Sequence, residues 1–455
     1  MLIVNIALMK ENTMNMTEGS PTKLILLFSI PMLIGNIFQQ LYSFADSMIV
    51  GRLLGPDALA SIGSTGAVSF FFFALSLGIG TGGGIITSQF FGRGDTAKVK
   101  NCIMNNAYIM IVMPIFVGGI AFFLAEPVLY LLRTPAEIKA NALLYLRINC
   151  VGMLFVSFYN YISSMLRSLG DSKTPLYFLI FSCLLNVGLD FLFIKAFNLG
   201  VFGAGVATVI SQFLSGILCL IFAVKTNSYF KFSKNDYIVN FPVIRDTIKL
   251  GMPVSLQFAM IAISCMALQS VVNSFGPVAV AAFTATEKIE EFVHLPYQTL
   301  SAALSTFVGQ NYGAKKIDRV FKGYYKGLLI MAIFTTVIIP VIQFTGKAIT
   351  SLFVESDAVT QMGGRALQIT SIFYYFLGII YMVRGILYGV GDSLFSFING
   401  IVEVIGRVVF PLVLMRCFNL QSPWVIWWSV GLVWSIAGIT AWWRYAVIRK
   451  RLLLH

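Results

Sequence analysis

Residues 103–126 read IMNNAYIMIVMPIFVGGIAFFLAE, and only the last of them, Glu126, carries a charge. A helix of about 20 largely apolar residues crosses the hydrocarbon core of a bilayer, so this stretch predicts a membrane-spanning helix. The rest of the 455-residue chain has the same character, because 58% of its residues are hydrophobic and 11% are charged. About a quarter of the residues of a soluble domain are charged, so this composition excludes a soluble enzyme and a disordered chain.

Eleven further apolar runs bring the number of predicted spans to twelve. None is built from alternating ten-residue strands, so the sequence predicts an all-α polytopic membrane protein rather than a barrel. The predicted spans are 24–50, 58–90, 103–126, 138–167, 174–197, 202–224, 246–274, 278–309, 323–346, 360–389, 394–418 and 424–446.

Lysine and arginine indicate the orientation of these spans, because cytoplasmic loops carry an excess of both. One set of loops and the C-terminal end hold most of them, including Arg93, Lys98, Lys100, Lys173, Lys225, Lys231, Lys234, Arg245, Lys249, Lys315, Lys316, Arg319, Arg449, Lys450 and Arg451. We expect this side to face the cytoplasm, with both termini inside and the protein in the inner (plasma) membrane. The net charge of +13 then belongs to loops, and no nucleic-acid partner is expected.

Short loop motifs recur at an offset of 221 residues. The recurring pairs are Gly55-Pro56 with Gly276-Pro277, Gln89 with Gln310, and Gly170-Asp171-Ser172 with Gly391-Asp392-Ser393. Two six-span lobes in the same orientation are therefore predicted, related by a pseudo-two-fold axis along the membrane normal, as in many transporters. We predict a cytoplasmic tail at 1–22 with its first thirteen residues poorly ordered, an N-lobe at 23–225, a cytoplasmic linker at 226–245 and a C-lobe at 246–455.

Ionisable residues inside spans are costly in lipid and mark ion or substrate sites. In the first half these are Asp46 and Asp190, and Asn186 lies one helical turn before Asp190. Asn160 and Thr208 add neutral oxygens. An oxygen-only set suits a proton or a hard cation such as Na⁺. The alternative for Asp46 is an external helix end that faces water.

The repeat provides an internal control for this set. Shifted by 221 residues, Asp46 falls on Ala267, Asn160 on Tyr381, Asn186 on Arg407 and Asp190 on Pro411. The second half therefore lacks a copy of the acids, which favours one functional site in the first lobe.

The second half has charges of its own. Glu287, Glu290, Glu291 and His294 in the eighth span form either a second ion or substrate site or a locally paired cluster. Glu403 and Arg407 are spaced i, i+4, which predicts a structural ion pair within one helix. Pro31 and Pro253 lie inside spans, where proline removes a backbone hydrogen bond and bends a helix. Such a bend either gates movement or only shapes packing.

The chain resembles the multidrug and toxic compound extrusion (MATE) transporters, most closely their DinF-like bacterial branch, from about Thr17 to Arg451. The resemblance rests on the stretch from Gln39 to Asp46, the two Gly-Asp-Ser turns, and the run from Ser305 to Asn311. It implies a twelve-helix, two-lobed antiporter that exports organic, often cationic compounds in exchange for H⁺ or Na⁺. It also implies that Asp46, Asn160, Asn186, Asp190 and Thr208 form the coupling site, and that Na⁺ would bind at four of these, without Asn160. The acid of the NorM-like branch is replaced by Ile261.

The sequence therefore predicts an ion-coupled exporter that works by alternating access. The partners expected are the lipid bilayer and small organic cations, and the protein is expected to be a monomer that needs no cofactor beyond its coupling ion. The alternative on the same fold is a flippase for a lipid-linked oligosaccharide, whose cavity should be strongly basic. An enzyme is not expected, because no nucleophile–base pair, cofactor motif or metal cluster appears in the sequence.

Overall fold

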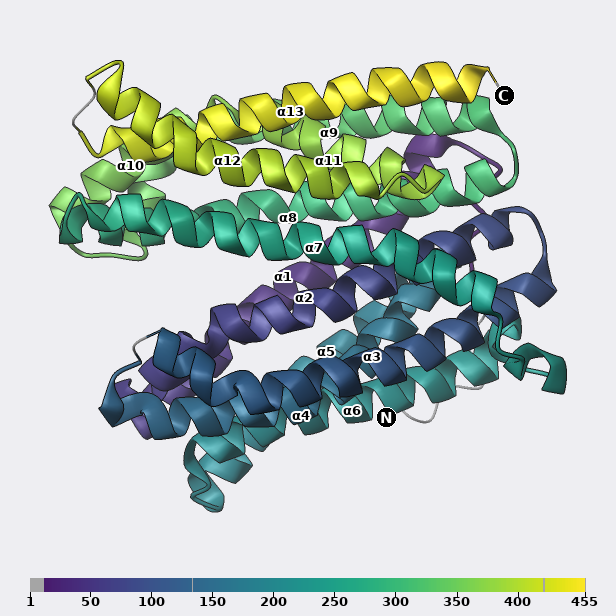
Figure 1. Cartoon of the computed structure of the whole chain (residues 1–455), viewed down its shortest axis with the longest axis horizontal. Coiled ribbons are helices and arrows are strands. Elements are labelled where there is room, and N and C mark those ends of the chain that lie inside the picture. Colours follow the sequence, from purple (N-terminus) through teal and green to yellow (C-terminus); the bar gives the residue numbers. More distant parts are fainter. Residues whose placement is uncertain (1–11, 133, 420–421, 455) are drawn as a thin grey trace. The chain divides into compact units, whose positions relative to one another are not determined.

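The computed structural model describes residues 12–132, 134–419 and 422–454, and all regular elements within these ranges are helical (Figure 1). The thirteen α-helices are α1 (Pro21–Leu54), α2 (Pro56–Gly92), α3 (Thr96–Leu131), α4 (Ala136–Ser168), α5 (Lys173–Asp190), α6 (Gly200–Thr226), α7 (Phe241–Asn273), α8 (Pro277–Gly313), α9 (Ile317–Ser351), α10 (Asp357–Ser371), α11 (Tyr374–Val390), α12 (Leu394–Arg416) and α13 (Trp424–Leu453).

The helices account for the twelve predicted spans. Ten of them are long and apolar enough to cross a membrane, and the pair α10 and α11 forms one further span that is bent by 55°. The remaining long helix, α8, has 37 residues and contains the charged cluster from Glu287 to His294. Two hydroxyl-rich or charged helices therefore interrupt an otherwise apolar series, and the chain is a multi-pass membrane protein.

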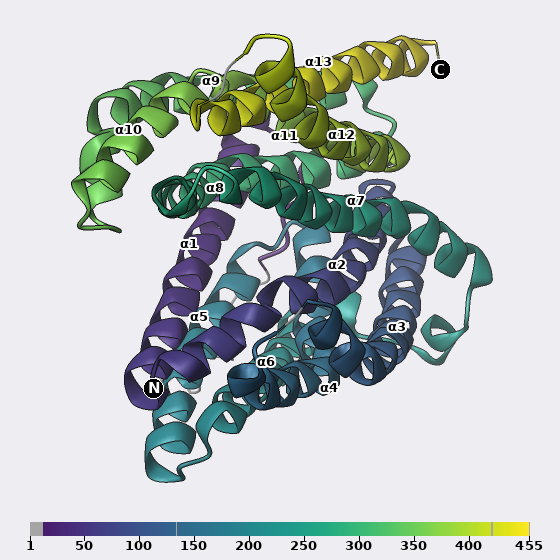
Figure 2. The same ribbon diagram turned by 60° about the vertical axis from the view of Figure 1, so that its left-hand side comes forward.

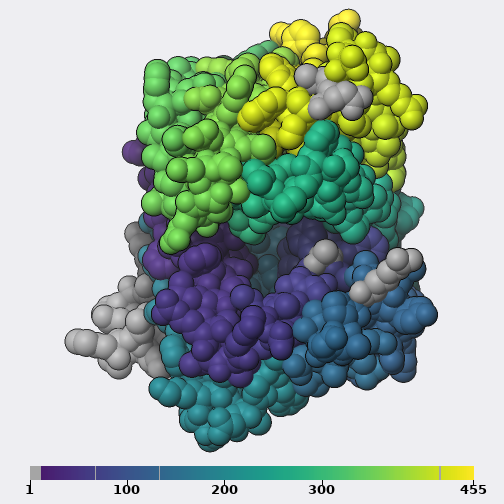
Figure 3. All heavy atoms as spheres, turned by 90° about the vertical axis from the view of Figure 1, so that its left-hand side faces the viewer, coloured from purple at the N-terminus to yellow at the C-terminus, as the bar shows by residue number. Residues whose placement is uncertain are grey.

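One predicted span, 360–389, is not a continuous helix. α10 ends at Ser371 and α11 begins at Tyr374. At the break, the Gln343 side chain of α9 donates to the Gln368 carbonyl and to the Ser371 hydroxyl, both at 2.8 Å. A side chain from a neighbouring helix thus satisfies a carbonyl near the end of α10, which makes the break affordable in lipid. Figure 3 faces the end of this unit, where α10 (green) reaches the surface.

The predicted repeat is present in the backbone. α2 and α8 each have 37 residues, begin with proline and are offset by 221 residues. Left-handed or related positive-φ positions recur at the same offset: Gly55 (87°) with Gly276 (86°), Gly94 (74°) with Lys315 (58°), and Gly170 (84°) with Gly391 (89°). Loops with the same unusual backbone at the same spacing are the mark of two copies of one fold.

The described chain divides into two compact units. Unit 1 contains residues 12–16 and Ile30–Ser255, and unit 2 contains Thr17–Ser29 and the chain from Leu256 onward. This division differs from the predicted lobes at 23–225 and 246–455, because the first helix of each repeat begins in the other unit. Pro31 and Pro253 lie inside α1 and α7 close to these two boundaries.

The predicted linker at 226–245 is not a free connection but packs on α3 within unit 1. Phe230 is fully buried in a cluster of apolar side chains. Asn105 donates to the Ile238 carbonyl at 3.2 Å and accepts from the Asn240 amide at 2.7 Å, while the Tyr108 hydroxyl donates to the Tyr237 carbonyl at 2.9 Å. Polar side chains of α3 therefore hold this segment by its backbone.

The end of the predicted tail is also held in place. The Met14 amide donates to the Leu169 carbonyl at 3.2 Å, Asn227 donates to the Thr13 hydroxyl at 3.2 Å, and Met16 is fully buried. The prediction of poor order is therefore wrong for residues 12 and 13, and its remaining part, 1–11, lies outside the described residues.

Candidate functional site

Four of the five predicted coupling residues meet inside unit 1. Asp46 comes from α1, Asn186 and Asp190 from α5, and Thr208 from α6. The carboxyl groups of Asp46 and Asp190 are hydrogen-bonding neighbours. The Asn186 amide donates to the Thr208 hydroxyl at 3.2 Å, and Asn186 and Asp190 are buried. The structure thus places two acids and two neutral oxygen groups in one water-poor cluster.

The fifth predicted residue, Asn160, is not tied to this cluster. Its amide donates to the Val156 carbonyl of its own helix, α4, at 2.9 Å, and no hydrogen bond to the other four is present among the described residues. α1 and α5, which carry the two acids, lie side by side (Figure 2), and Leu176 and Leu179 of α5 pack against Gly35 of α1.

Two tyrosines belong to the cluster and were not predicted. The Tyr42 side chain hydrogen-bonds to Thr208 and lies within electrostatic range of both acids. Tyr145 of α4 is close to the same acids and contacts Asn149. Tyr42 precedes Asp46 by one helical turn, so the i, i+4 spacing could have identified it. Tyr145 has no such signal, because 18 tyrosines are spread over the sequence.

A π-helical turn, η2 (Phe191–Ala196), follows directly after Asp190. π-helical turns inside α-helices are rare and occur frequently at functional sites, because the wider turn re-aims side chains. The apolar pattern of residues 174–197 is uniform through this point, so the sequence gave no sign of the change in helix type.

In unit 2 the predicted ion pair between Glu403 and Arg407 is replaced by a different one. Glu403 binds Arg384 of α11, and both side chains are buried. Arg384 also donates to the Asn399 carbonyl oxygen at 3.1 Å. Arg407 turns to α7 and donates to the Cys265 sulfur at 2.9 Å. The i, i+4 spacing misled the prediction because a partner from another helix reaches the same carboxylate.

The acidic cluster of α8 divides between two environments. Glu287 and Lys288 are exposed, and Lys288 forms an ion pair with Glu291 at 3.3 Å. Glu290 and His294 turn their polar atoms inward, where the His294 ring packs edge-on against Trp434 at 5.7 Å between ring centroids. The four predicted residues therefore do not form one site, and a role for Glu290 and His294 stays a prediction.

Twelve spans, repeated in two units with buried polar clusters, define a membrane transporter rather than an enzyme scaffold. The family model MatE matches residues 31–192 and 253–413, which together exceed half of the chain and include one segment from each repeat. The chain therefore belongs to the MatE family, the multidrug and toxic compound extrusion transporters.

Individual relatives agree with this assignment. The chain is 33% identical over 415 residues to the probable multidrug resistance protein YpnP of Bacillus subtilis, covering 90% of this chain and 87% of the relative. It is 23% identical to the multidrug export protein MepA of Staphylococcus saprophyticus, covering 96% of each. A crystal structure of a MATE protein in complex with MaL6 has the same fold, with a TM-score of 0.90, 23% identity, and coverage of 97% of this chain and 99% of that one. Its relatives place this chain among drug-export transporters.

Proposed function

We propose that this protein is an ion-coupled antiporter that exports organic, mainly cationic compounds, with Asp46 and Asp190 as the coupling site. The observation that carries the proposal is the direct contact between these two carboxyl groups. Two carboxyl groups can hydrogen-bond to each other only when a proton lies between them. Like charges this close cannot both ionise, so the pair can take up and release a proton as its surroundings change.

The contact between the acids favours H⁺ as the coupling ion over Na⁺. Asn186 and Thr208 offer oxygen atoms that a Na⁺ ion could also use, so the experiment below includes both ions. One proton that enters along a membrane potential of 100 mV releases about 2.3 kcal/mol, enough for a roughly fifty-fold accumulation of exported compound. Coupling requires only that the proton and the exported compound stabilise different states of the transporter.

Alternating access is proposed on the basis of the repeat, because two six-span units of the same fold provide two bodies that can rock around a shared path. The basic loops support a cytoplasmic position for both termini. A monomer in the plasma membrane is sufficient for this mechanism.

A flippase for a lipid-linked pyrophosphate is less well supported. Such a substrate requires unpaired cationic side chains, and one of the two arginines buried in unit 2, Arg384, is neutralised by Glu403. Arg407 donates to a cysteine rather than to an acid, and one arginine is too little for a pyrophosphate.

The test is transport in proteoliposomes that contain the purified protein and a fluorescent organic cation. An imposed pH gradient should drive dye movement, and an imposed Na⁺ gradient should not. Asp46→Asn and Asp190→Asn should reduce the pH-driven rate at least tenfold, because each removes one member of the proton-sharing pair.

The matched control is Glu126→Gln, which removes an exposed acid of the same unit. Its rate should equal that of the unchanged protein. If Asp46→Asn and Asp190→Asn transport at the unchanged rate, the proposed coupling site is wrong. Dye movement driven only by Na⁺ would retain the antiporter and replace the ion.

A further inference from the structure

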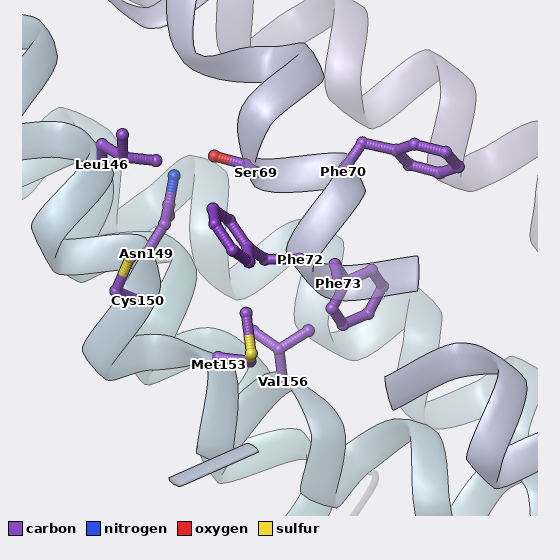
Figure 4. A pocket seen from close by; sticks show the side chains of 9 residues that line it. All are labelled: Ser69, Phe70, Phe72, Phe73, Leu146, Asn149, Cys150, Met153 and Val156. Atoms are coloured by element: carbon purple, nitrogen blue, oxygen red, sulfur yellow. The ribbon is translucent and has the colours of Figure 1, made fainter. Parts of the chain in front are cut away.

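A cavity of about 210 Å³ lies between α2 and α4 in unit 1 (Figure 4). Apolar side chains form most of its wall, with Phe72 and Phe73 from α2 and Cys150 and Met153 from α4. Figure 4 shows the Phe72 ring between the two helices, while the Phe70 ring points away from the space. The described wall contains no charged side chain, so the cavity suits an uncharged apolar group.

One hydroxyl in this cavity is available to a ligand. On the same helix, Ser61, Ser64 and Thr65 each donate to the carbonyl three residues earlier, at 2.7 to 2.8 Å. Hydroxyls in membrane helices usually make such bonds. The Ser69 oxygen is buried and makes no hydrogen bond within the described residues. An unmet buried hydroxyl is costly, and a ligand that bonds to it removes that cost.

The cavity is connected to the acid pair through α4. Asn149 lines the cavity and contacts the side chain of Tyr145, one helical turn earlier. Tyr145 in turn lies within electrostatic range of Asp46 and Asp190. One layer of side chains therefore separates an apolar space from the two acids.

We propose that this cavity binds the aromatic part of an exported amphipathic cation, whose charged nitrogen points along Asn149 and Tyr145 toward Asp46 and Asp190. Phenyl faces and the sulfur atoms of methionine and cysteine make favourable contacts with aromatic rings. A cavity of about 150 Å³ accommodates benzene, so the larger space here fits a substituted ring or two fused rings. This inference rests on the proposed function and adds to it the substrate class and the residues that select it.

Two probes of equal charge test the inference on the purified full-length protein in detergent. One is naphthylmethyl-trimethylammonium, which has a fused aromatic pair, and the other is tetraethylammonium, which has none. Isothermal titration calorimetry measures the dissociation constant of each. The unchanged protein should bind the aromatic probe at least tenfold more tightly, because only that probe fills the cavity.

Phe72→Ala should weaken binding of the aromatic probe about tenfold and leave tetraethylammonium within twofold of its original value. Phe72→Leu, which retains an apolar side chain, should have an intermediate effect and provides a folded variant if the alanine variant fails to fold. The matched control is Phe116→Ala on α3, whose side chain is 64% exposed and lies outside the cavity. It should change neither dissociation constant.

The outcomes separate this inference from the proposed function. If both Phe72 variants keep the full preference for the aromatic probe, the cavity assignment is wrong while the antiporter stands. If Asp190→Asn leaves the binding of both probes unchanged, the acid pair does not hold the cation, and the orientation proposed here fails. Native mass spectrometry adds a third arm: a phospholipid retained by the unchanged protein and lost in Phe72→Ala, with unchanged affinity for both probes, would assign the cavity to an acyl chain instead.

Discussion

Unit 1 and unit 2 are two copies of one backbone, yet they treat buried charge in opposite ways. In unit 1 the acids Asp46 and Asp190 meet each other. In unit 2 the buried acid Glu403 meets the arginine Arg384. An acid pair changes its net charge when it takes up an ion, whereas an acid–base pair is already neutral. The comparison indicates that one copy of the fold is kept for ion binding and that the other is held in place by its charges.

The largest expected effect breaks the pair in unit 2. Arg384→Met leaves Glu403 buried without its partner and should cost about 3 to 5 kcal/mol of stability, while the double variant Arg384→Met/Glu403→Leu should recover most of that loss. Thermal unfolding of the purified protein in detergent measures both. Asp46→Asn in unit 1 should leave the unfolding temperature close to its original value. A double variant as unstable as Arg384→Met would contradict a simple pair and point to the wider network through Asn399.

The next effect compares the acids of the two units in transport. Asp190→Asn should reduce pH-driven dye transport at least tenfold, about 1.4 kcal/mol, whereas Glu290→Gln should reduce it less than threefold. The reason is that Asp190 has a second carboxyl group beside it and that Glu290 lies in the interior of the other unit. Both rates are measured in the same liposomes at equal protein content. A tenfold loss in Glu290→Gln would make unit 2 a second coupling site.

The spans and the repeat could be predicted from the sequence because they depend on long apolar runs and on loop motifs at a fixed offset. The break between α10 and α11 could not, since it depends on Gln343 of a neighbouring helix and the apolar pattern continues across residues 372 and 373. The coupling cluster was largely predictable, because few acids occur inside spans and each carries information.

The partners of the buried side chains were less predictable. Spacing along one helix suggested Arg407 for Glu403, but packing supplied Arg384 from α11. Tyr145 and the cavity beside it depend on which faces of α2 and α4 meet, and phenylalanine is too frequent in this chain, with 40 copies, for any single one to stand out.

The smallest effect concerns the two Gly-Asp-Ser turns, which differ in how the aspartate is used. Asp171 accepts from the Lys173 and Thr174 amides at the start of α5, at 3.1 and 2.9 Å, whereas Asp392 forms an ion pair with Arg444 at 2.8 Å. Burial raises the pKa of Asp171 above its usual range despite those bonds. The folded state therefore binds more protons than the unfolded state between the two pKa values, and stability falls as the pH rises through that window.

Asparagine keeps an acceptor oxygen and carries no charge, so the same substitution should have opposite signs at the two turns. At pH 7, Asp171→Asn should be neutral or stabilising and should flatten the dependence of stability on pH above 4. Asp392→Asn should destabilise by about 1 kcal/mol, because it removes a half-buried charged hydrogen bond. Unfolding temperatures at pH 4.5 and pH 7 measure both. Equal effects at the two turns would show that the aspartates play the same part.

The exchange of helix ends between the units has a consequence for the synthesis of the protein. Residues Thr17–Ser29 leave the ribosome among the first, yet the unit in which they pack is completed only by the chain from Leu256 onward. The opening turns of α1 must therefore wait, inserted but incompletely packed, for most of the remaining chain to be made. Contacts between such distant parts of a chain form slowly, so the first helix to enter the membrane is among the last to reach its final environment.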